Sequence, residues 1–348
     1  MLTRRRRPFT VLLAAAVLVT AASCGEQQPP LPPIAAVGDP VIGINPAAGT
    51  PGEQVAVLRS KPYAVAAATG AGHHGSGVTT PVEWAIPKPC SDCYVTRAVP
   101  RLLYTDGTEA NLDSGLMLHH FAQFNSGAVD VRCGTAPSQL LGEIWFNGGN
   151  ERTQGWSPAG TGYRVRPTDV WSQLFEVMNM NTTEKQVVFE MTYHWVPATT
   201  PGMHALKPVW IDVTDTCANS EFPAGTGAYS RRNTWTVTVP GRIMGMASHL
   251  HDGGTHTVLR NLTTGAVLCD SKAHYGGPGY ESGDGHHGVT AHLSGVDQCA
   301  ARSKAEPVAV IRRGDVLEIE AFYDAEAHPH EAGEPMMGVF FLFVLPEG

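Results

Sequence analysis

The stretch Met244-Gly245-Met246-Ala247-Ser248-His249-Leu250-His251-Asp252-Gly253-Gly254 combines two patterns that organise the whole chain. An apolar run is followed at once by Asp-Gly-Gly, a composition that is typical of a turn at the end of a β-strand. Side chains two residues apart on a strand project from the same face, so His249 and His251 can reach one ion together. The stretch therefore predicts a strand that ends in a metal-binding pair of histidines, although two surface histidines without a metal are the simpler alternative.

The same alternation of short apolar runs and turn residues continues through most of the chain from about Pro81. The 348 residues include Gly 38 and Pro 26, which favours a loop-rich β protein. We predict an all-β fold of two antiparallel, jelly-roll-like β-sandwiches in tandem, over residues 53–214 and 215–348. Strands are predicted at 94–104, 186–195, 234–239, 257–259, 308–322 and 338–345, and a short helix at 168–178.

The first 24 residues have the order of an export signal. Four arginines at 4–7 precede an apolar segment at 9–20 and the sequence Ala-Ala-Ser-Cys that ends at Cys24. This order resembles a bacterial lipoprotein signal, in which Cys24 is lipidated, and an ordinary secretory signal is the alternative. We expect an exported protein anchored to the outer face of the cell membrane through Cys24, with the Pro-, Gly- and Ala-rich residues 25–52 as a linker.

Charge and cysteine content limit the classes of partner and compartment. The net charge of -8 is spread without long runs, which argues against nucleic acid as a partner. Export places the six further cysteines in an oxidising compartment, where an even number indicates up to three disulfides. Cys90-Ser-Asp-Cys93 also fits a redox or zinc motif, but no second pair of this spacing accompanies it.

Three other motifs offer metal ligands in strand-like contexts. His119 and His120 are adjacent in an apolar run, and neighbours on a regular strand point to opposite faces, so both can bind one metal only where the strand bulges. His194 stands alone in Phe-Glu-Met-Thr-Tyr-His-Trp, and Met336 and Met337 open the last predicted strand. Each motif taken alone is also compatible with a structural role in the core or on the surface.

In this order, the four motifs resemble the copper type II ascorbate-dependent monooxygenases, the family of peptidylglycine α-hydroxylating monooxygenase and dopamine β-monooxygenase. The sequence Arg-Arg-Gly-Asp-Val-Leu-Glu-Ile-Glu-Ala at 312–321 is similar to the strand that precedes the methionine ligand of that family. The resemblance covers about residues 85–348 and implies two copper ions per chain. The implied ligands are His119, His120 and His194 at the first copper, and His249, His251 and Met336, with Met337 as the alternative, at the second.

The resemblance also implies an activity. In that family the copper bound by two histidines and a methionine activates O2, so His249, His251 and Met336 are the implied catalytic residues. The other copper delivers an electron, and ascorbate or a similar donor reduces both ions. Ala247 occupies the position at which peptide-amidating members carry an arginine for the peptide carboxylate, so an apolar or aromatic small molecule is the expected substrate. The alternatives are a copper-binding lipoprotein that buffers, senses or carries the metal, and a surface interaction module.

A disulfide pattern follows from the same resemblance. Cys93 with Cys133 resembles a bridge of the family, and Cys269 with Cys299 and Cys90 with Cys217 are assigned as the remaining pairs. The glycine-rich contexts of His73-His74 and His286-His287 predict exposed loops. His256, His328 and His330 are candidates for groups that lie beside a metal.

Overall fold

The computed structural model describes residues 28–35, 37, 40–44, 49–70, 77–134, 141–214, 216–217, 219–282, 289–331 and 333–347. Within these ranges the chain is almost entirely β structure, with one short 3-10 helix, η2 (Leu112–Ser114), and no α-helix. The all-β prediction is therefore confirmed. The predicted signal with Cys24, His73-His74 and His286-His287 lie outside the described residues. No helix in the described ranges is long and apolar enough to cross a membrane.

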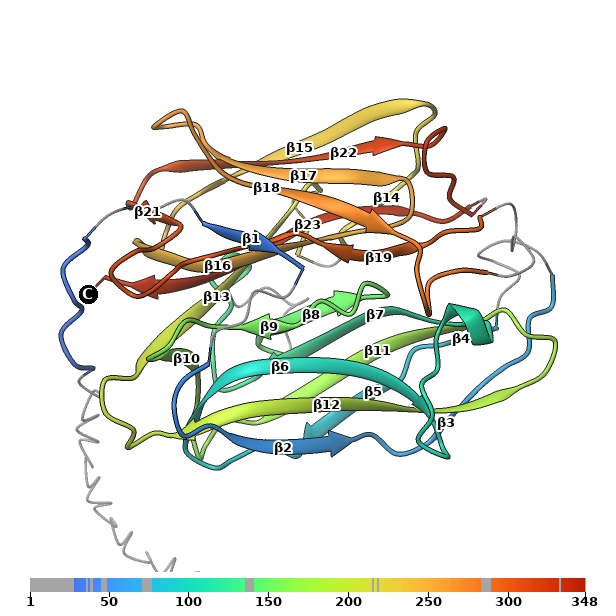
Figure 1. The fold of residues 1–348 in the computed structure, drawn as a ribbon, viewed down its shortest axis with the longest axis horizontal. Helices are drawn as coiled ribbons and strands as arrows, with labels where there is room; N and C mark the ends of the chain where they lie inside the picture. The colour runs from blue at the N-terminus through green and yellow to red at the C-terminus, as the bar shows by residue number, and fades with distance from the viewer. Residues whose placement is uncertain are drawn as a thin grey trace, which may run out of the picture.

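Two β-sandwiches are stacked one above the other, and one 13-stranded sheet runs through both (Figure 1). The first sandwich packs one half of this sheet against a separate five-stranded sheet. In the large sheet it contributes β2 (Gln54–Arg59), β3 (Tyr63–Val65), β6 (Cys93–Tyr104), β9 (Gly155–Trp156), β10 (Thr161–Val165) and β12 (Lys185–Pro197). The five-stranded sheet contains β4 (Gly77–Thr79), β5 (Val82–Ile86), β7 (Leu116–Asn125), β8 (Glu143–Gly149) and β11 (Trp171–Asn179).

The second sandwich packs the other half of the large sheet against a second five-stranded sheet. The large sheet crosses between the sandwiches where β10 and β13 pair in parallel, and the other pairings are antiparallel. Its strands here are β1 (Val41–Gly43), β13 (His204–Asp212), β14 (Glu221–Phe222), β16 (Gly241–Leu250), β20 (Gln298–Ala300), β21 (Ala309–Ile311) and β23 (Met336–Pro346). The covering sheet contains β15 (Ala228–Thr236), β17 (Gly254–Asn261), β18 (Ala266–Tyr275), β19 (Leu293–Val296) and β22 (Val316–Asp324).

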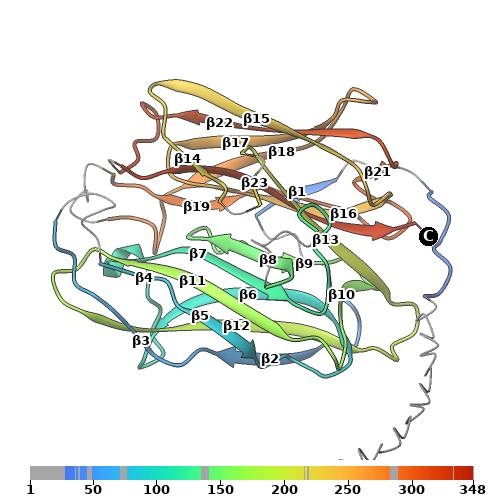
Figure 2. The same cartoon turned by 180° about the vertical axis from the view of Figure 1, so that it is seen from behind.

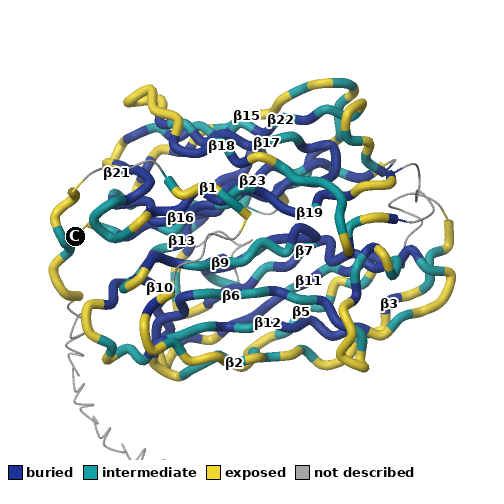
Figure 3. The backbone as a smooth tube through the Cα atoms, viewed as in Figure 1, coloured by how far each residue is buried: buried dark blue, intermediate teal, exposed yellow. Residues whose placement is uncertain are grey.

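Each sandwich has its own apolar core, and a third apolar cluster lies between the two sandwiches. Phe124 and Ile144 of the first sandwich meet Trp210, Val339 and Phe341 of the second in this third cluster. The view from behind shows β7, β8 and β11 lying next to β13 and β23 (Figure 2). Burial is continuous across this junction, and exposed residues gather on the loops and on the outer strand β2 (Figure 3). The junction is therefore part of the folded interior.

The predicted helix at 168–178 is wrong, because this segment forms β11 in the first sandwich. Trp171, Phe175 and Val177 all point into the core of that sandwich. Phe175 and Val177 are two residues apart, which is the period of a strand. Burial of these large side chains between two sheets decides the local structure here.

Part of the predicted linker lies on the folded body. β1 pairs with β20 in the large sheet, and the Ala35 backbone N–H donates to the Ala305 carbonyl at 2.9 Å. Further towards the N-terminus, the His204 ring N–H donates from Nε2 to the Pro29 carbonyl at 2.8 Å. Residues in the range 29–43 therefore make defined contacts with the second sandwich.

Three disulfides are formed, Cys90–Cys93, Cys133–Cys217 and Cys269–Cys299. The Cys269–Cys299 assignment is confirmed, whereas Cys93–Cys133 and Cys90–Cys217 are wrong. Cys93 lies in the core of the first sandwich, while Cys133 belongs to the cluster between the sandwiches, where Cys217 packs beside it. The two cysteines expected to pair thus sit in different layers of the molecule.

The closed loops differ greatly in length, and this predicts different contributions to stability. Cys269–Cys299 closes a loop of 30 residues and Cys90–Cys93 a loop of 3. Because a longer loop removes more entropy from the unfolded chain, we expect Cys269→Ala/Cys299→Ala to lower the free energy of unfolding by about 3 kcal/mol. Urea denaturation measures the loss. Cys90→Ala/Cys93→Ala is the control and should cost clearly less; an equal loss in both variants would contradict this account.

Candidate metal centre

A β-bulge in β7 turns two neighbouring histidines to the same side of the strand. Against β11, His120 is opposite Glu176 and Leu118 is opposite Val177, so His119 is the extra, unpaired residue. Leu118 and Phe121 consequently both point into the core of the first sandwich although they are three residues apart. The rings of His119 and His120 lie side by side, with centroids 4.1 Å apart. The bulge that a shared metal requires is therefore present.

The second pair of histidines lies at the end of β16 and faces the first pair. Leu250, between them, belongs to the core of the second sandwich, so His249 and His251 project away from that core and towards β7. His251 is the first residue beyond the strand and opens the turn that the Asp-Gly-Gly sequence predicted. The metal-binding face of this strand end thus points at the other sandwich.

Four histidines from the two sandwiches meet in one cluster. Nε2 of His120 lies 2.8 Å from Nε2 of His251. The ring centroids of His119 and His251 are 4.8 Å apart, and those of His120 and His249 are 5.5 Å apart. One ring nitrogen from each of His119, His120 and His251 lies within 4.8 Å of the others. We call His119, His120, His249 and His251 the histidine cluster.

Three of the four imidazoles are fixed through Nδ1, which leaves Nε2 as the donor atom for a metal. An N–H at Nδ1 that donates to a carboxylate or carbonyl sets the tautomer and the ring orientation, as is usual for metal-binding histidines. The three contacts are His119 to Glu176 Oε1 at 2.6 Å, His249 to Glu151 Oε1 at 3.0 Å, and His251 to the Pro335 carbonyl at 2.5 Å.

Buried acidic groups surround the cluster and would balance the charge of a metal ion. Glu334 lies 3.7 Å from Nε2 of His119 and 3.8 Å from Nδ1 of His251, and burial raises the pKa of this carboxyl. Burial alone would lower the pKa of His119, but the hydrogen bond to Glu176 and the nearby carboxylate of Glu334 outweigh it and raise this pKa to about 9. Protons therefore compete with a metal for His119 below about pH 9.

The donor set fits copper. Imidazole nitrogen is a good ligand for copper in both of its oxidation states, and zinc, nickel and iron also accept it. Nε2 of His249 is buried and has no hydrogen-bond partner among the described residues. A buried, unpartnered ring nitrogen is costly, and a metal ion would remove that cost.

Gly149 allows the two sandwiches to approach at the cluster, and its neighbour Gly148 leaves room for Phe121 within the first sandwich. A Cβ on Gly149 would lie 2.6 Å from Cε1 of His249 and 2.5 Å from the carbonyl oxygen of His119. Gly148 has a similar constraint, at 2.9 Å from the ring of Phe121. These glycines end β8, and Glu151 follows in the next turn, where it holds His249. This group is not among the residues predicted from sequence, although a Gly-Gly strand end followed by a glutamate is a signal that could have indicated it.

His194 does not join the cluster. Its neighbour Tyr193 points into the first sandwich, where its hydroxyl hydrogen-bonds with Gln123 of β7. His194 therefore points to the opposite face of β12, and its Nδ1 lies 3.3 Å from Glu53. The expected grouping with His119 and His120 is not formed, because β12 belongs to the sheet on the far side of that sandwich.

Met337, the alternative methionine ligand, faces the histidines, whereas the preferred ligand Met336 does not. Met336 is fully buried in the core of the second sandwich. Met337 points to the other face of β23, where it lines a cavity together with His120 and His249. The alternation of side chains along the strand thus selects Met337.

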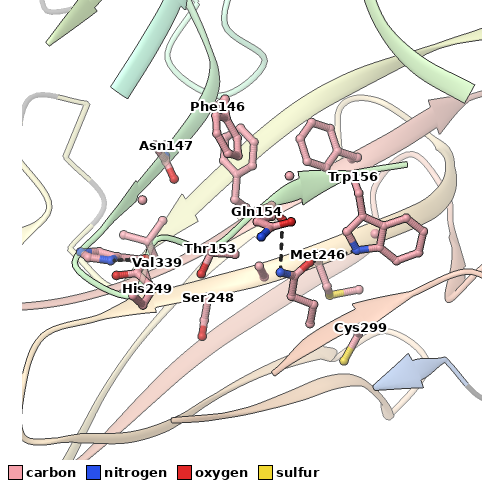
Figure 4. Close-up of a pocket in the computed structure, with 18 of the residues that line it drawn as sticks. Phe146, Asn147, Thr153, Gln154, Trp156, Met246, Ser248, His249, Cys299 and Val339 are labelled. Carbon is pink, nitrogen blue, oxygen red and sulfur yellow. Dashed lines mark hydrogen bonds and ion pairs between the residues drawn. The ribbon is translucent and has the colours of Figure 1, made fainter. Parts of the chain in front are cut away.

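Two cavities adjoin His249. The larger, which we call the interunit cavity, has a volume of about 320 Å³ and is also lined by His120 and Met337. The smaller has about 30 Å³ and lies between the β8–β9 segment and β16, with Phe146, Trp156 and Met246 on its walls (Figure 4). Both cavities lie between the sandwiches, so small molecules have space next to the cluster.

The three other histidines expected near a metal are placed outside the cluster. His256 stacks on Phe322 in the outer sheet of the second sandwich, and His328 stacks on Tyr275. His330 lies over the turn that follows His251, 3.4 Å from the position of a Cβ on Gly253. None of the three belongs to the group of ring nitrogens that can share an ion.

Comparison with known proteins identifies the family. The family model for Stress up-regulated Nod 19 matches residues 174–347. The probable copper-dependent oxygenase M1 of Phoma sp. is 31% identical over 274 residues, which is 75% of this chain and 66% of that protein. The probable copper-dependent oxygenase clz3 of Cochliobolus lunatus is 32% identical over 258 residues, or 70% and 77% of the two chains. The chain belongs to the Stress up-regulated Nod 19 family, and these two proteins are its homologues.

The geometry predicts different effects on copper affinity for His120 and His194, which the family resemblance assigned to the same copper site. His120→Ala removes a ring nitrogen from the centre of the cluster, so we expect copper affinity to fall by a factor of about 100 or more. His194→Ala is the matched control and should leave copper affinity unchanged, because His194 lies beside Glu53. Competitive titration with a copper chelator measures both. A comparable loss in the two variants would show that His194 is a ligand.

A second prediction concerns the close approach at Gly149. Gly149→Ala places a methyl group against His249 and the β7 backbone, so we expect copper affinity to fall at least about tenfold while the protein remains folded. Gly43→Ala is the control, because a Cβ there meets nothing within 4 Å. Chelator competition and circular dichroism report affinity and folding separately. Unchanged affinity in Gly149→Ala would mean that His249 does not contribute to the metal.

Proposed function

We propose that the protein is a copper-dependent oxygenase that hydroxylates a C–H bond of a small apolar or aromatic substrate. The observation that carries the proposal is the convergence of four imidazoles from two sandwiches, with three of them fixed through Nδ1. The two homologues named as probable copper-dependent oxygenases support the same assignment. The order of the ligand motifs, which resembles the copper type II monooxygenases, supports a monooxygenase in particular.

The bound copper would supply the redox chemistry that side chains lack, because O2 reacts slowly with C–H bonds without a metal or another cofactor. The overall reaction balances as R–H + O2 + 2 electrons + 2 protons giving R–OH + H2O. A one-electron donor such as ascorbate is the proposed source of the electrons.

The protein residues would hold and shape the site. Nε2 atoms of His119, His120 and His251 would hold the ion, and the unpartnered Nε2 of His249 would offer a fourth nitrogen. Glu176, Glu151 and the Pro335 carbonyl keep three of the rings in place. Met337 offers a soft thioether nearby, which favours the reduced form of copper. The His119 ring is 3% exposed and the His251 ring 4%, so bulk water is excluded from this side.

We propose one copper ion per chain instead of the two that the family resemblance implied. The four rings form one cluster with neighbouring centroids 4.1 to 5.5 Å apart, and ring nitrogens of His119, His120 and His251 lie close enough to share one ion. His194 is held by Glu53 in a different layer, so the residues expected for a separate electron-transfer site are not assembled. The histidine cluster would then hold the one ion that supplies the redox chemistry.

Export as a lipoprotein remains part of the proposal. It rests on the arginine-rich and apolar order of residues 1–24 that ends at Cys24. The three disulfides agree with an oxidising compartment. The enzyme would then meet its substrate and its reductant outside the cell membrane.

Copper loading combined with oxygen uptake tests the proposal. Protein starting at Gly25 is loaded with copper and dialysed, and we expect one copper per chain and ascorbate-driven O2 consumption above that of free copper. His120→Ala should lose this consumption, and His194→Ala should retain it. Copper binding without any O2 consumption would contradict the oxygenase and favour a copper carrier. Failure to bind copper would overturn both.

A further inference from the structure

The interunit cavity is a large space that contacts the histidine cluster directly. His120 and His249 line it, with Met337 beside them. Its volume of about 320 Å³ is at the lower end of the range for small-molecule sites. We infer that this cavity is the substrate pocket and that it selects an uncharged molecule with an apolar ring or branched chain. This inference rests on the proposed function.

The walls of the cavity are apolar and come from both sandwiches. Ala122 and Phe124 follow His120 on the same face of β7, because every second residue of a strand shares a face. Leu174 of β11 continues this wall. The opposite wall is formed by Trp210 of β13 and by Met337 and Val339 of β23. A flat or branched apolar body would therefore be contacted from two sides, with one end at the metal ligands.

The charges around the cavity exclude an anion. No arginine or lysine is among the described residues that line it, and its one carboxylate is Glu221. In the copper-free protein, an anionic molecule would lose its hydration without gaining an arginine or lysine partner, which is unfavourable. Asn147, Asn219 and Ser220 offer neutral polar groups for a hydroxyl, carbonyl or amide on the substrate. The cavity thus discriminates by charge in favour of uncharged molecules.

The size of the cavity limits the substrate. A water-sized group occupies about 30 Å³, so about ten non-hydrogen atoms fit into this space. This corresponds to a benzene ring with two small substituents. A larger molecule would have to leave part of its body in solvent.

A disulfide holds one wall in place. Cys217 lines the cavity and is bonded to Cys133, which lies in the apolar cluster between the sandwiches. The bond ties the segment after β13 to the turn that contains Cys133. The position of Asn219 and Ser220 at the cavity is therefore defined by a covalent link.

Binding of two probes of matched shape tests the inference. 4-Ethylbenzamide and 4-ethylbenzoate differ in charge and have the same number of non-hydrogen atoms, which matches the space available. Calorimetric titration of the copper-free and the copper-loaded protein measures the affinity without reference to turnover. We expect 4-ethylbenzamide to bind the copper-free form at least tenfold more tightly than 4-ethylbenzoate, whereas in the copper-loaded form the metal itself can attract the benzoate. Equal binding of the two probes to the copper-free form, or tighter binding of the benzoate to it, would overturn the inference.

A cavity-filling variant locates the binding site. Ala122→Phe should weaken 4-ethylbenzamide binding at least tenfold without loss of copper, whereas Ala64→Phe, on the exposed face of β3, should leave both unchanged. Leu174→Phe fills the cavity from β11 and gives the same readout if Ala122→Phe does not fold. Unaltered probe binding in the folded filling variant would place the probe elsewhere and overturn the inference.

Failure of the inference and failure of the proposed function are distinguishable. Copper binding with ascorbate-driven O2 consumption, but without the preference for the amide, would overturn the substrate pocket alone. A protein that binds 4-ethylbenzamide in the cavity and binds no copper would overturn the proposed function, and with it the assignment of the bound molecule as a substrate.

Discussion

The site depends on the contact between the bulge in β7 and the end of β16. The extra residue at His119 brings two neighbouring histidines to one face, and the turn after Leu250 presents two more from the other sandwich. Neither sandwich carries a complete set of ligands. The packing between the sandwiches, with Trp210 and Phe341 at its centre, therefore determines the geometry of the metal centre.

The carboxylates that hydrogen-bond the histidine rings set the orientation of the metal ligands. Glu176 lies on β11 next to the bulge, and Glu151 follows the glycine pair that ends β8. Both carboxylates belong to the first sandwich, yet Glu151 orients a histidine of the second. A ligand set shared in this way forms only when both sandwiches are folded and docked.

The sequence was sufficient to predict features within single strands and turns, but not how strands from the two sandwiches pack together. Strand periodicity and turn composition predicted the strand that carries His249 and His251, because both signals lie within one element. The same alternation predicted that only one of Met336 and Met337 can face a metal. Strand periodicity does not show which faces of the two sandwiches pack against each other. The family resemblance implied that His194 joins His119 and that Cys93 pairs with Cys133, but the fold places the members of each pair in separate layers.

The most direct test of the account is an anomalous difference map, recorded at the copper absorption edge from crystals of the copper-loaded protein. We predict a single strong peak between the ring nitrogens of His119, His120 and His251, within bonding distance of all three. A peak beside His194 and Glu53, or two separate peaks of equal height on the two sandwiches, would contradict a single metal centre built at their junction.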